Sequence, residues 1–187
     1  VGSILVSWII MALLIVFHSA TGNVEKLALS IAEGAESQGI EAWLRTPPMP
    51  RDSEYLTVTK DELRACQGLA LGSPSRFGSM SSHMKAFFET TSDLWLSGAM
   101  VDKPAGVFGA SSSLHGGNEA VLLGLTLPLL HHGMLVTGIP YTQAGLNQTQ
   151  GGGTPYGPTT VENESGEPHS HELELAHHLG QRLARLI

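Results

Sequence analysis

Short apolar runs that alternate with stretches of helical spacing restrict the fold of this chain more than any other feature. The clearest run, "ALLIVFH" (12–18), has no polar side chain before its final histidine. An unbroken run of this kind is typical of a strand buried on both faces of a parallel sheet. The same pattern predicts strands at "IEAWLR" (40–45), "QGLALGS" (67–73), "KPAGVFGAS" (103–111) and "MLVTGIP" (134–140).

Helical patterns fill the intervals between these runs. Residues 24–38 place Val24, Leu27 and Ile31 on one helical face, and Gly39 suits the end of that helix. Since strands and helices alternate, we expect an α/β fold in which a five-stranded parallel sheet is covered by helices on both sides.

The remaining helices are predicted by capping signals and spacing. Thr59 and Glu62 have the spacing of a capping box at the start of a helix over 59–66. Further helices are expected over 80–95 and 118–132, and a last one is capped by Ser170. The buried stripe of that last helix is expected to consist of Leu173, Ala176, Leu179, Leu183 and Leu186.

Length and composition favour one globular domain over residues 11–187. The chain has 187 residues, of which 42% are hydrophobic and 14% charged, which is typical of a folded domain. A formal net charge of −7 argues against a general nucleic-acid binder. The single cysteine, Cys66, fits a reducing compartment, so we expect a cytoplasmic protein. Its place at the start of an apolar run favours packing over a nucleophilic role.

The N-terminal residues are treated separately from the fold. The apolar run from Ile4 to Phe17 is shorter than the ~20 residues that span a bilayer, and it lacks a basic leader. We therefore expect no membrane span, and interpret residues 1–10 as an atypical segment, foreign to the natural chain or unusual in it. Met11 is a candidate natural start. A membrane-associated end is the alternative.

The turn "HSATGN" (18–23) is the first candidate site. It joins a predicted strand to a predicted helix, and the first turn of a helix offers unpaired N–H groups and a partial positive charge. Ser19, Thr21 and Asn23 add polar side chains. Because a dinucleotide glycine fingerprint and a Walker lysine are both missing, the expected ligand is a monophosphate. The alternative is an ordinary capped turn.

A second loop, "GSPSRFG" (72–78), follows the third predicted strand. Pro74 stiffens it, and a planar aromatic ligand would have room against its backbone. Arg76 would offer donors to a carbonyl group or to developing negative charge. In the alternative interpretation Arg76 is a surface residue and Phe77 packs a helix. Both loops belong to the edge where α/β sheets bind ligands.

Longer stretches of the sequence resemble the WrbA family of flavodoxin-like NAD(P)H:quinone oxidoreductases. They are "GSPSRFGSMSSHMKAFFETTSDLWLSGAMVDKPAGVF", "LLHHGMLV" and "GGTPYGPTT", in the family's order. The resemblance covers most of the chain from Ile15 onwards. It implies a flavodoxin-like fold with strand order 2-1-3-4-5, FMN as cofactor, NADH or NADPH and quinones as substrates, and a homotetramer whose neighbouring subunits help to wall the pocket.

The resemblance also implies the site residues. His131 matches the active-site histidine, which also contacts the cofactor, whereas Trp95, Thr21 and Phe77 would contact substrate. No metal ligands are implied. The cofactor-binding residues would be Ser19, Ala20, Thr21, Gly22, Asn23, Val24, Pro74, Ser75, Arg76, Phe77, Gly78, Ser111, Ser112, Ser113, Gly116, Gly117 and His131.

The expected reaction is a ping-pong cycle. NAD(P)H reduces the flavin by hydride transfer and leaves, and a quinone then takes two electrons at the same place. A flavodoxin-like electron carrier without a quinone site and a non-enzymatic scaffold are the alternatives. Azo and nitro compounds are further candidate substrates.

This sequence departs from the family pattern at three places. The third loop reads "GASSSLHGGNE", Thr21 stands where many relatives have tyrosine, and the stretch Arg45–Thr59 is short. The histidines near the C-terminus lack H-E-x-x-H spacing, so a solvated helix face is preferred there to a metal site.

Overall fold

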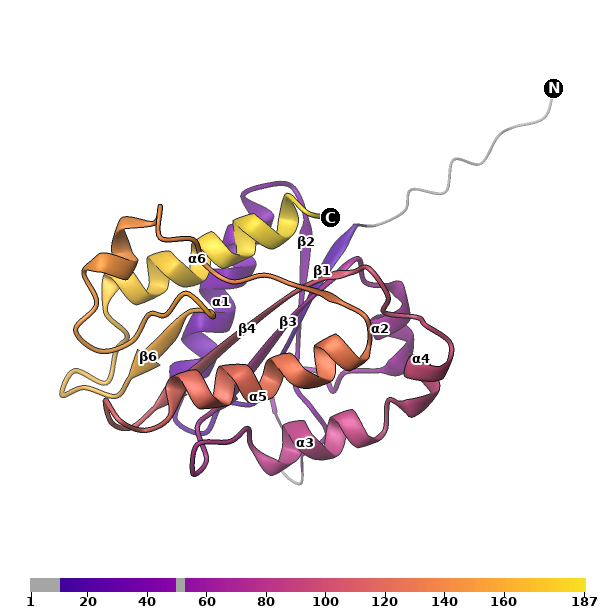
Figure 1. Ribbon diagram of the computed structural model, residues 1–187, viewed down its shortest axis with the longest axis horizontal. Coiled ribbons are helices and arrows are strands. Elements are labelled where there is room, and N and C mark those ends of the chain that lie inside the picture. Colours follow the sequence, from indigo (N-terminus) through magenta and orange to yellow (C-terminus); the bar gives the residue numbers. More distant parts are fainter. Residues whose placement is uncertain (1–10, 50–52) are drawn as a thin grey trace.

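A parallel sheet with strand order β2-β1-β3-β4-β5 forms the centre of the molecule (Figure 1). The computed structural model describes residues 11–49 and 53–187, so the segment 1–10 lies outside the described residues. Every strand pairing is parallel. The strands are β1 (Ala12–Phe17), β2 (Glu41–Arg45), β3 (Gly68–Pro74), β4 (Pro104–Ser111), β5 (Leu135–Val136) and β6 (Thr159–Val161).

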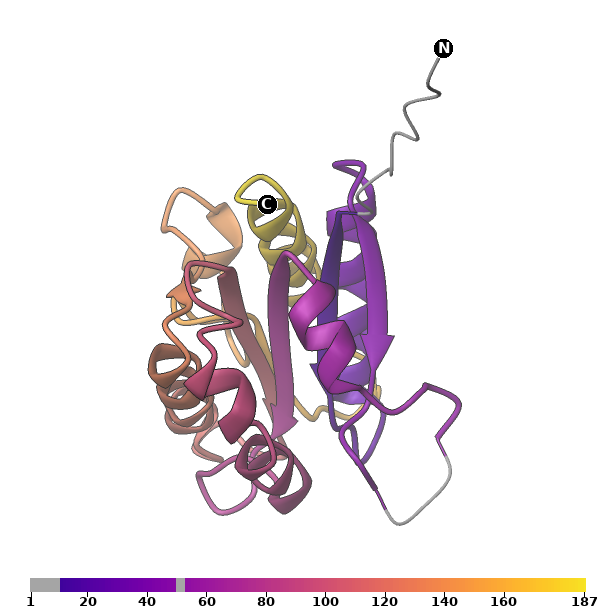
Figure 2. The same ribbon diagram turned by 90° about the vertical axis from the view of Figure 1, so that its right-hand side faces the viewer.

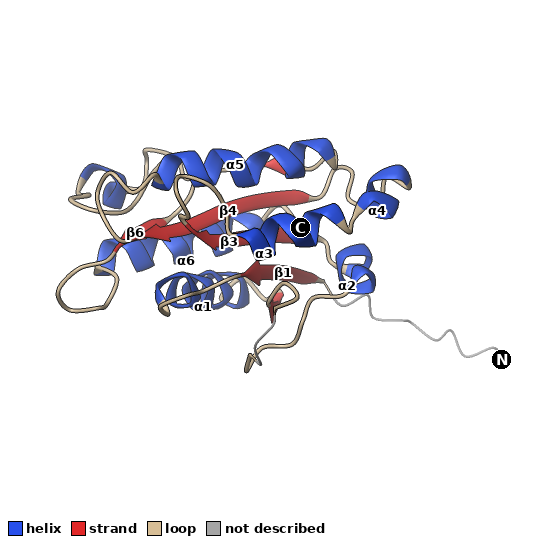
Figure 3. Cartoon of the chain, turned by 90° about the horizontal axis from the view of Figure 1, so that it is seen from below, coloured by secondary structure: helices blue, strands red, loops and turns tan. Residues whose placement is uncertain are grey.

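This strand order confirms the predicted flavodoxin-like fold. Helices cover both faces of the sheet, with α1 and α6 on one side and α5 on the other (Figure 3). The short helices α2, α3 and α4 pack on the same side as α5. The helices are α1 (Asn23–Glu36), α2 (Lys60–Ala65), α3 (Ser82–Glu89), α4 (Ser92–Leu96), α5 (Asn118–His131), the 3₁₀ turn η1 (Ala144–Asn147) and α6 (Ser170–Ala184). None of the helices in the described ranges is long and apolar enough to cross a lipid bilayer.

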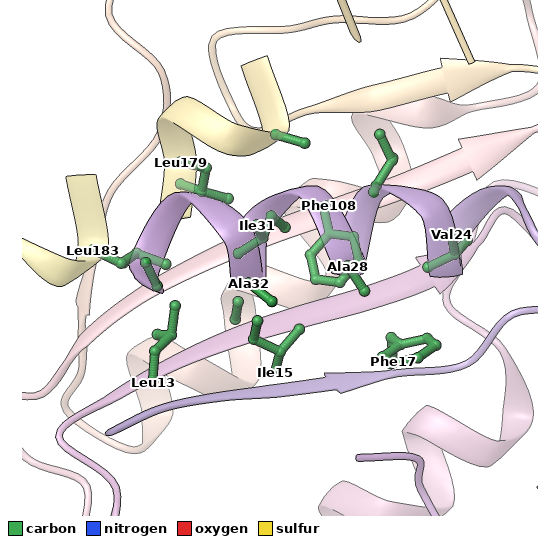
Figure 4. Close-up of a cluster of buried hydrophobic side chains, with 14 of the residues drawn as sticks. Leu13, Ile15, Phe17, Val24, Ala28, Ile31, Ala32, Phe108, Leu179 and Leu183 are labelled. Atoms are coloured by element: carbon green, nitrogen blue, oxygen red, sulfur yellow. The ribbon is translucent and has the colours of Figure 1, made fainter. Parts of the chain in front are cut away.

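Alternate residues of β1 supply two separate cores. Leu13, Ile15 and Phe17 point toward α1 and α6, where Figure 4 shows them among the side chains of those helices. Leu14 and Val16 point to the opposite face, beneath α3 and α5. Burial on both faces explains why the strand has an unbroken apolar sequence.

One helical prediction is confirmed in detail, and two need correction. The side chain of Thr59 accepts a hydrogen bond from the N–H of Glu62 at the start of α2, as the capping box predicts. The N-cap of α6 is His169 rather than Ser170. The predicted stripe of α6 is also wrong at its end, because Leu186 lies beyond the helix and is 55% exposed, whereas Leu175 is buried.

The helix predicted over 80–95 is two helices, α3 and α4. The hydroxyl of Thr90 donates to the carbonyl of Phe87 at 2.7 Å, and that of Thr91 donates to the carbonyl of Phe88 at 2.8 Å. Such bonds satisfy the helix end locally and compete with continued helix. Two consecutive threonines therefore end α3 and redirect the chain.

The fifth strand is divided, which the sequence did not predict. The run 134–140 contributes only the two residues of β5, which pair with the first half of β4. After a long excursion, β6 pairs with Gly109–Ser111 in the second half of β4. Since β3 occupies the other side of β4, β5 and β6 share one position in the sheet.

The short segment after β2 folds back over the first strand. Thr46 bridges to Thr57, and the ring of Tyr55 packs edge-on against Phe17 with centroids 5.1 Å apart. The Tyr55 hydroxyl donates to the Glu25 carboxylate at 2.8 Å. Burial, followed by this hydrogen bond, raises the pKa of Tyr55 to about 12.

Helices α1 and α6 cross at two glycines. A Cβ built on Gly34 would overlap the carbonyl oxygen of His177, and one built on Gly180 would overlap that of Ile31. Each glycine thus allows one backbone to approach the other, and the resulting contact closes one face of the sheet.

We predict opposite effects of glycine-to-alanine changes in α1 and α5. Gly34→Ala lowers the free energy of unfolding by about 2 kcal/mol, because backbone must move to admit the methyl group. Gly124→Ala serves as the control, since no atom lies within 4 Å of its Cβ position. It raises stability by about 0.8 kcal/mol through helix propensity. Urea unfolding measures both, and equal effects would contradict this account of the crossing.

Candidate flavin site

The carboxyl ends of four strands surround a hollow at one edge of the sheet. Figure 2 shows the strand arrows directed toward this edge, at the bottom of the view. The hollow has a volume of about 100 Å³ and is lined from the loops after β1, β3, β4 and β6. Its lining residues are Ala20, Thr21, Asn23, Val24, Pro74, Ser75, Arg76, Ala110, Ser111, Ser112 and Glu162.

The start of α1 leaves main-chain donors free at this hollow. The N-cap is Gly22 at φ 91°, which has no side chain to cap the helix. The Ser19 hydroxyl accepts hydrogen bonds from the N–H groups of Gly22 (3.1 Å) and Glu25 (3.2 Å). Among the described residues, the N–H groups of Asn23 and Val24 have no acceptor. Two free donors at the positive end of a helix form a cradle for an anion.

The second loop ends in a tight two-residue turn. The backbones of Arg76 and Ser79 exchange hydrogen bonds of 2.8 and 3.1 Å. Between them, Phe77 and Gly78 both have positive φ, of 56° and 77°, as a type I′ turn requires. Phe77 therefore holds a left-handed conformation that is unfavourable for a bulky residue, and its ring is fully exposed.

The third loop is in contact with the second. The Ser75 hydroxyl donates to the carbonyl of Gly116. A Cβ on Gly117 would lie 2.9 Å from the Cα of Gly78, so only glycine permits this approach. The two loops together form one wall beside the α1 cradle.

The predicted cofactor residues are thus largely gathered around one hollow. Nine of the seventeen line it. The others from the three loops lie beside it without lining it: Ser19, Gly22, Phe77, Gly78, Ser113, Gly116 and Gly117. The one remaining predicted cofactor residue, His131, lies elsewhere.

His131 and Trp95 lie at a second hollow, which shares no lining residue with the first. This hollow has a volume of about 540 Å³ and lies over α3, α4 and α5. One subunit therefore does not bring these two side chains together with Thr21. The second hollow is lined by Lys85, Phe88, Glu89, Thr91, Ser92, Trp95, Leu127, Pro128, His131 and His132.

His132 has the structural role that its position suggests. Its Nε2 lies 2.9 Å from the Thr91 hydroxyl, at the α3–α4 junction. Burial, together with neighbouring His131, lowers the pKa of His132. A neutral ring at this place joins α5 to the corner between the two short helices.

Two features near the cradle escaped the sequence analysis. His18 follows β1 and packs edge-on against His83, with ring centroids 4.9 Å apart. Burial lowers the pKa of His18, and nearby His83 and Arg76 lower it further. Glu162 lines the hollow and directly follows β6, which is not among the strands that the sequence predicted. His18 is the first residue of the turn 18–23, but the sequence analysis gave it no role. No local sequence signal indicated that Glu162 would line the hollow.

Other titratable groups show no sign of a reactive centre. Cys66 is buried and its Sγ–H donates to the carbonyl of Leu63 at 3.3 Å. Burial raises the pKa of its thiol to about 11, which fits packing rather than nucleophilic chemistry. Within residues 11–49 and 53–187, no group of three or more His, Cys, Asp or Glu is placed to hold a metal ion.

The parallel order and the anion cradle define a flavodoxin-like protein, and comparisons with known proteins agree. Residues 13–145 match the family described as NADPH-dependent FMN reductase. A protein of Rhizobium rhizogenes named NAD(P)H dehydrogenase (quinone) is 39% identical, covering 92% of this chain and 95% of its own. One of the same name from Syntrophobacter fumaroxidans is 36% identical, covering 94% and 97%.

The solved structures agree with the sequence relatives. A WrbA-like flavodoxin from Agrobacterium tumefaciens superimposes with a TM-score of 0.69 at 27% identity, over 94% of this chain and 96% of its own. The chain belongs to the NADPH-dependent FMN reductase family, and its resemblance to the WrbA group is confirmed.

We predict that the left-handed turn at Phe77 costs stability. Phe77→Gly and Phe77→Ala both remove the exposed ring, but only glycine adopts positive φ without steric cost. Phe77→Gly should therefore be more stable than Phe77→Ala by about 1 kcal/mol. Thermal and urea unfolding compare the two variants. Equal stabilities would show that the backbone at residue 77 is not constrained in solution.

Proposed function

We propose that this protein is an FMN-dependent NAD(P)H:quinone oxidoreductase that reduces quinones by two electrons. The observation that carries the proposal is the hollow itself. It places free helix N–H groups beside two interlocked loops, in a chain that shares family and more than a third of its sequence with proteins of that name.

The residues present fit FMN. A terminal phosphate would accept from the N–H groups of Asn23 and Val24, with hydroxyl support from Ser19 and Thr21. The flavin ring would lie against the backbone of residues 74–78 and the loop 111–117. FMN, when bound, supplies the hydride chemistry, since none of the described side chains forms a nucleophilic centre.

The protein's task is to hold one face of the ring and leave the other open. Phe77, which follows the lining residues Pro74, Ser75 and Arg76, has a fully exposed ring. Nicotinamide and quinone would use the same open face in turn, which is the structural requirement of a ping-pong cycle. A cytoplasmic location is part of the same proposal, supported by the nicotinamide reductant and the reduced thiol of Cys66.

A homotetramer completes the proposed site. α5 is apolar around its whole circumference, and its outer face exposes Leu123, Leu127 and Leu130. Exposed Trp95 and Leu96 lie on α4 nearby in the same layer. An apolar outer face is typical of a helix that is buried, so we infer that other subunits cover this face of α5.

Subunit association also gives His131 and Trp95 a role. Both line the second hollow, on the face that carries the exposed leucines. In the assembly, these side chains would approach the flavin hollow of a neighbouring subunit. His131 would then donate a hydrogen bond or proton to a quinone oxygen, and Trp95 would contact the quinone ring.

We predict that Leu127→Glu dissociates the assembly. A charge in an apolar interface is strongly unfavourable, so the variant should sediment as a smaller species than the wild type. FMN affinity should change less than 3-fold, whereas the KM for quinone should rise by about 10-fold as the contacts from the neighbour are lost. Leu186→Glu, at an exposed site beyond α6, is the matched control. A wild-type monomer, or an intact tetramer in Leu127→Glu, would contradict the proposed assembly.

The decisive test of the activity is the absorbance of the FMN-loaded protein. NADH or NADPH, added without oxygen, should bleach the flavin band near 450 nm within seconds, and benzoquinone should restore it without a long-lived one-electron species. Bleaching that is slow with both nucleotides, but rapid with a one-electron donor, would indicate an electron carrier. A chain that takes up no flavin would indicate a scaffold.

A further inference from the structure

Glu162 is the single carboxylate among the residues that line the flavin hollow. It is the first residue after β6, and its N–H donates to the carbonyl of Ser111 at 2.9 Å. Within the described part of the chain, its carboxylate has neither a hydrogen-bond donor nor an ion-pair partner. Arg76 also lines the hollow, but among the described residues it forms no ion pair with Glu162.

The backbone that carries Glu162 is firmly held. β6 pairs with Gly109–Ser111 of β4, and Val161 is buried. The hydroxyl of Thr160 donates to the buried carboxylate of Glu172 at 2.7 Å, and the same carboxylate accepts from the N–H of Gly152 at 2.6 Å. The main chain at Glu162 is therefore fixed by the adjoining strand and does not belong to a free loop.

A carboxylate is unexpected in a hollow that receives a phosphate. Like charges repel, and Glu162 lines the same hollow as the N–H groups at the start of α1 and the Arg76 side chain, which attract an anion. The neighbouring Lys26 does not offset the charge, because it pairs with Glu167 at 2.8 Å. Glu162 is exposed, so water can donate to its carboxylate in the free protein, and a ligand that replaces this water in the hollow must itself donate hydrogen bonds.

The part of a flavin nucleotide between ring and phosphate has this chemistry. It is a chain of hydroxyl-bearing carbons, and it must cross from the loops at 74–78 to the start of α1. Glu162 and Ser111 line the same hollow as residues of both segments. We propose that the Glu162 carboxylate accepts hydrogen bonds from the ribityl hydroxyls, and that it selects flavins carrying this side chain. This inference rests on the proposed function, because it assigns a residue to the same flavin site.

Three flavins test the assignment. FMN, riboflavin and lumiflavin differ stepwise, since riboflavin lacks the phosphate and lumiflavin lacks the ribityl chain as well. Dissociation constants are measured by quenching of flavin fluorescence for wild type, Glu162→Ala and Glu162→Gln. Glu164→Gln, exposed two residues further along and outside the hollow, is the matched control.

The expected result is a selective loss. Glu162→Ala should raise the dissociation constants of FMN and riboflavin by a similar factor of about 10, as expected when a charge-assisted hydrogen bond is lost. The dissociation constant of lumiflavin should not change. Glu162→Gln, which keeps a neutral acceptor, should lose less. Glu164→Gln should match the wild type.

Three outcomes would contradict the role of Glu162 without contradicting the proposed function. Tighter FMN binding in Glu162→Ala, with riboflavin unchanged, would mean that the carboxylate only repels phosphate. Equally weaker binding of all three flavins would mean that the substitution damages the loop. Unchanged binding of all three would mean that the Glu162 carboxylate does not contact the flavin. Wild-type protein that binds none of the three would overturn the proposed function together with this inference.

Discussion

The open N-terminus of α1 is the constraint on which the candidate site depends. β1 is buried along its whole length, so the chain can offer polar chemistry only after Phe17. Within five residues it must then reverse into α1, and it does so through Gly22 in the left-handed region. Gly22 has no capping side chain, and the Ser19 hydroxyl accepts from the N–H of Glu25 alone in the first turn. In the described part of the chain the N–H groups of Asn23 and Val24, two residues that line the hollow, have no acceptor, and such a helix start favours an anionic ligand.

The other loops at this edge of the sheet, after β3 and β4, hold their place beside the start of α1 through contacts with each other and with the sheet. Gly117 and Gly78 meet so closely that neither loop can shift independently of the other. On the far side, β6 extends the sheet beside β4, and the buried carboxylate of Glu172 holds it through Thr160. The shape of the hollow therefore depends on sheet pairing that begins far from the site in sequence.

The sequence predicted those features that local chemistry decides. β1 and β4 followed from unbroken apolar runs, and the turn at 18–23 followed from its small and hydroxyl residues. The loop after β3 was also a candidate site from its residues alone, and the resemblance to a known family added the order of the sheet and the loop after β4. These signals are local, so each can be recognised without its partners in the fold.

What the sequence did not predict is decided by distant partners. β6 lies in a stretch that looks like a polar loop and becomes a strand only because β5 leaves half of β4 unpaired. Glu162 reaches the hollow through that pairing. The break at Thr90 and Thr91 depends on side-chain bonds that compete with helix. His131 and Trp95 were expected beside the cofactor, yet within one subunit they line a different hollow, because α5 carries His131 and α4 carries Trp95 in the helical layer on the other side of the sheet from α1.

The central claim is that main-chain N–H groups at the start of α1 hold a flavin phosphate while the ring lies against the turn at Phe77. A crystal structure of the protein with FMN tests it most directly. The account predicts phosphate oxygens within hydrogen-bond distance of the N–H groups of Asn23 and Val24, and the ring along residues 76–78 with one face open. FMN bound at any other place, or with its phosphate directed into solvent, would contradict it.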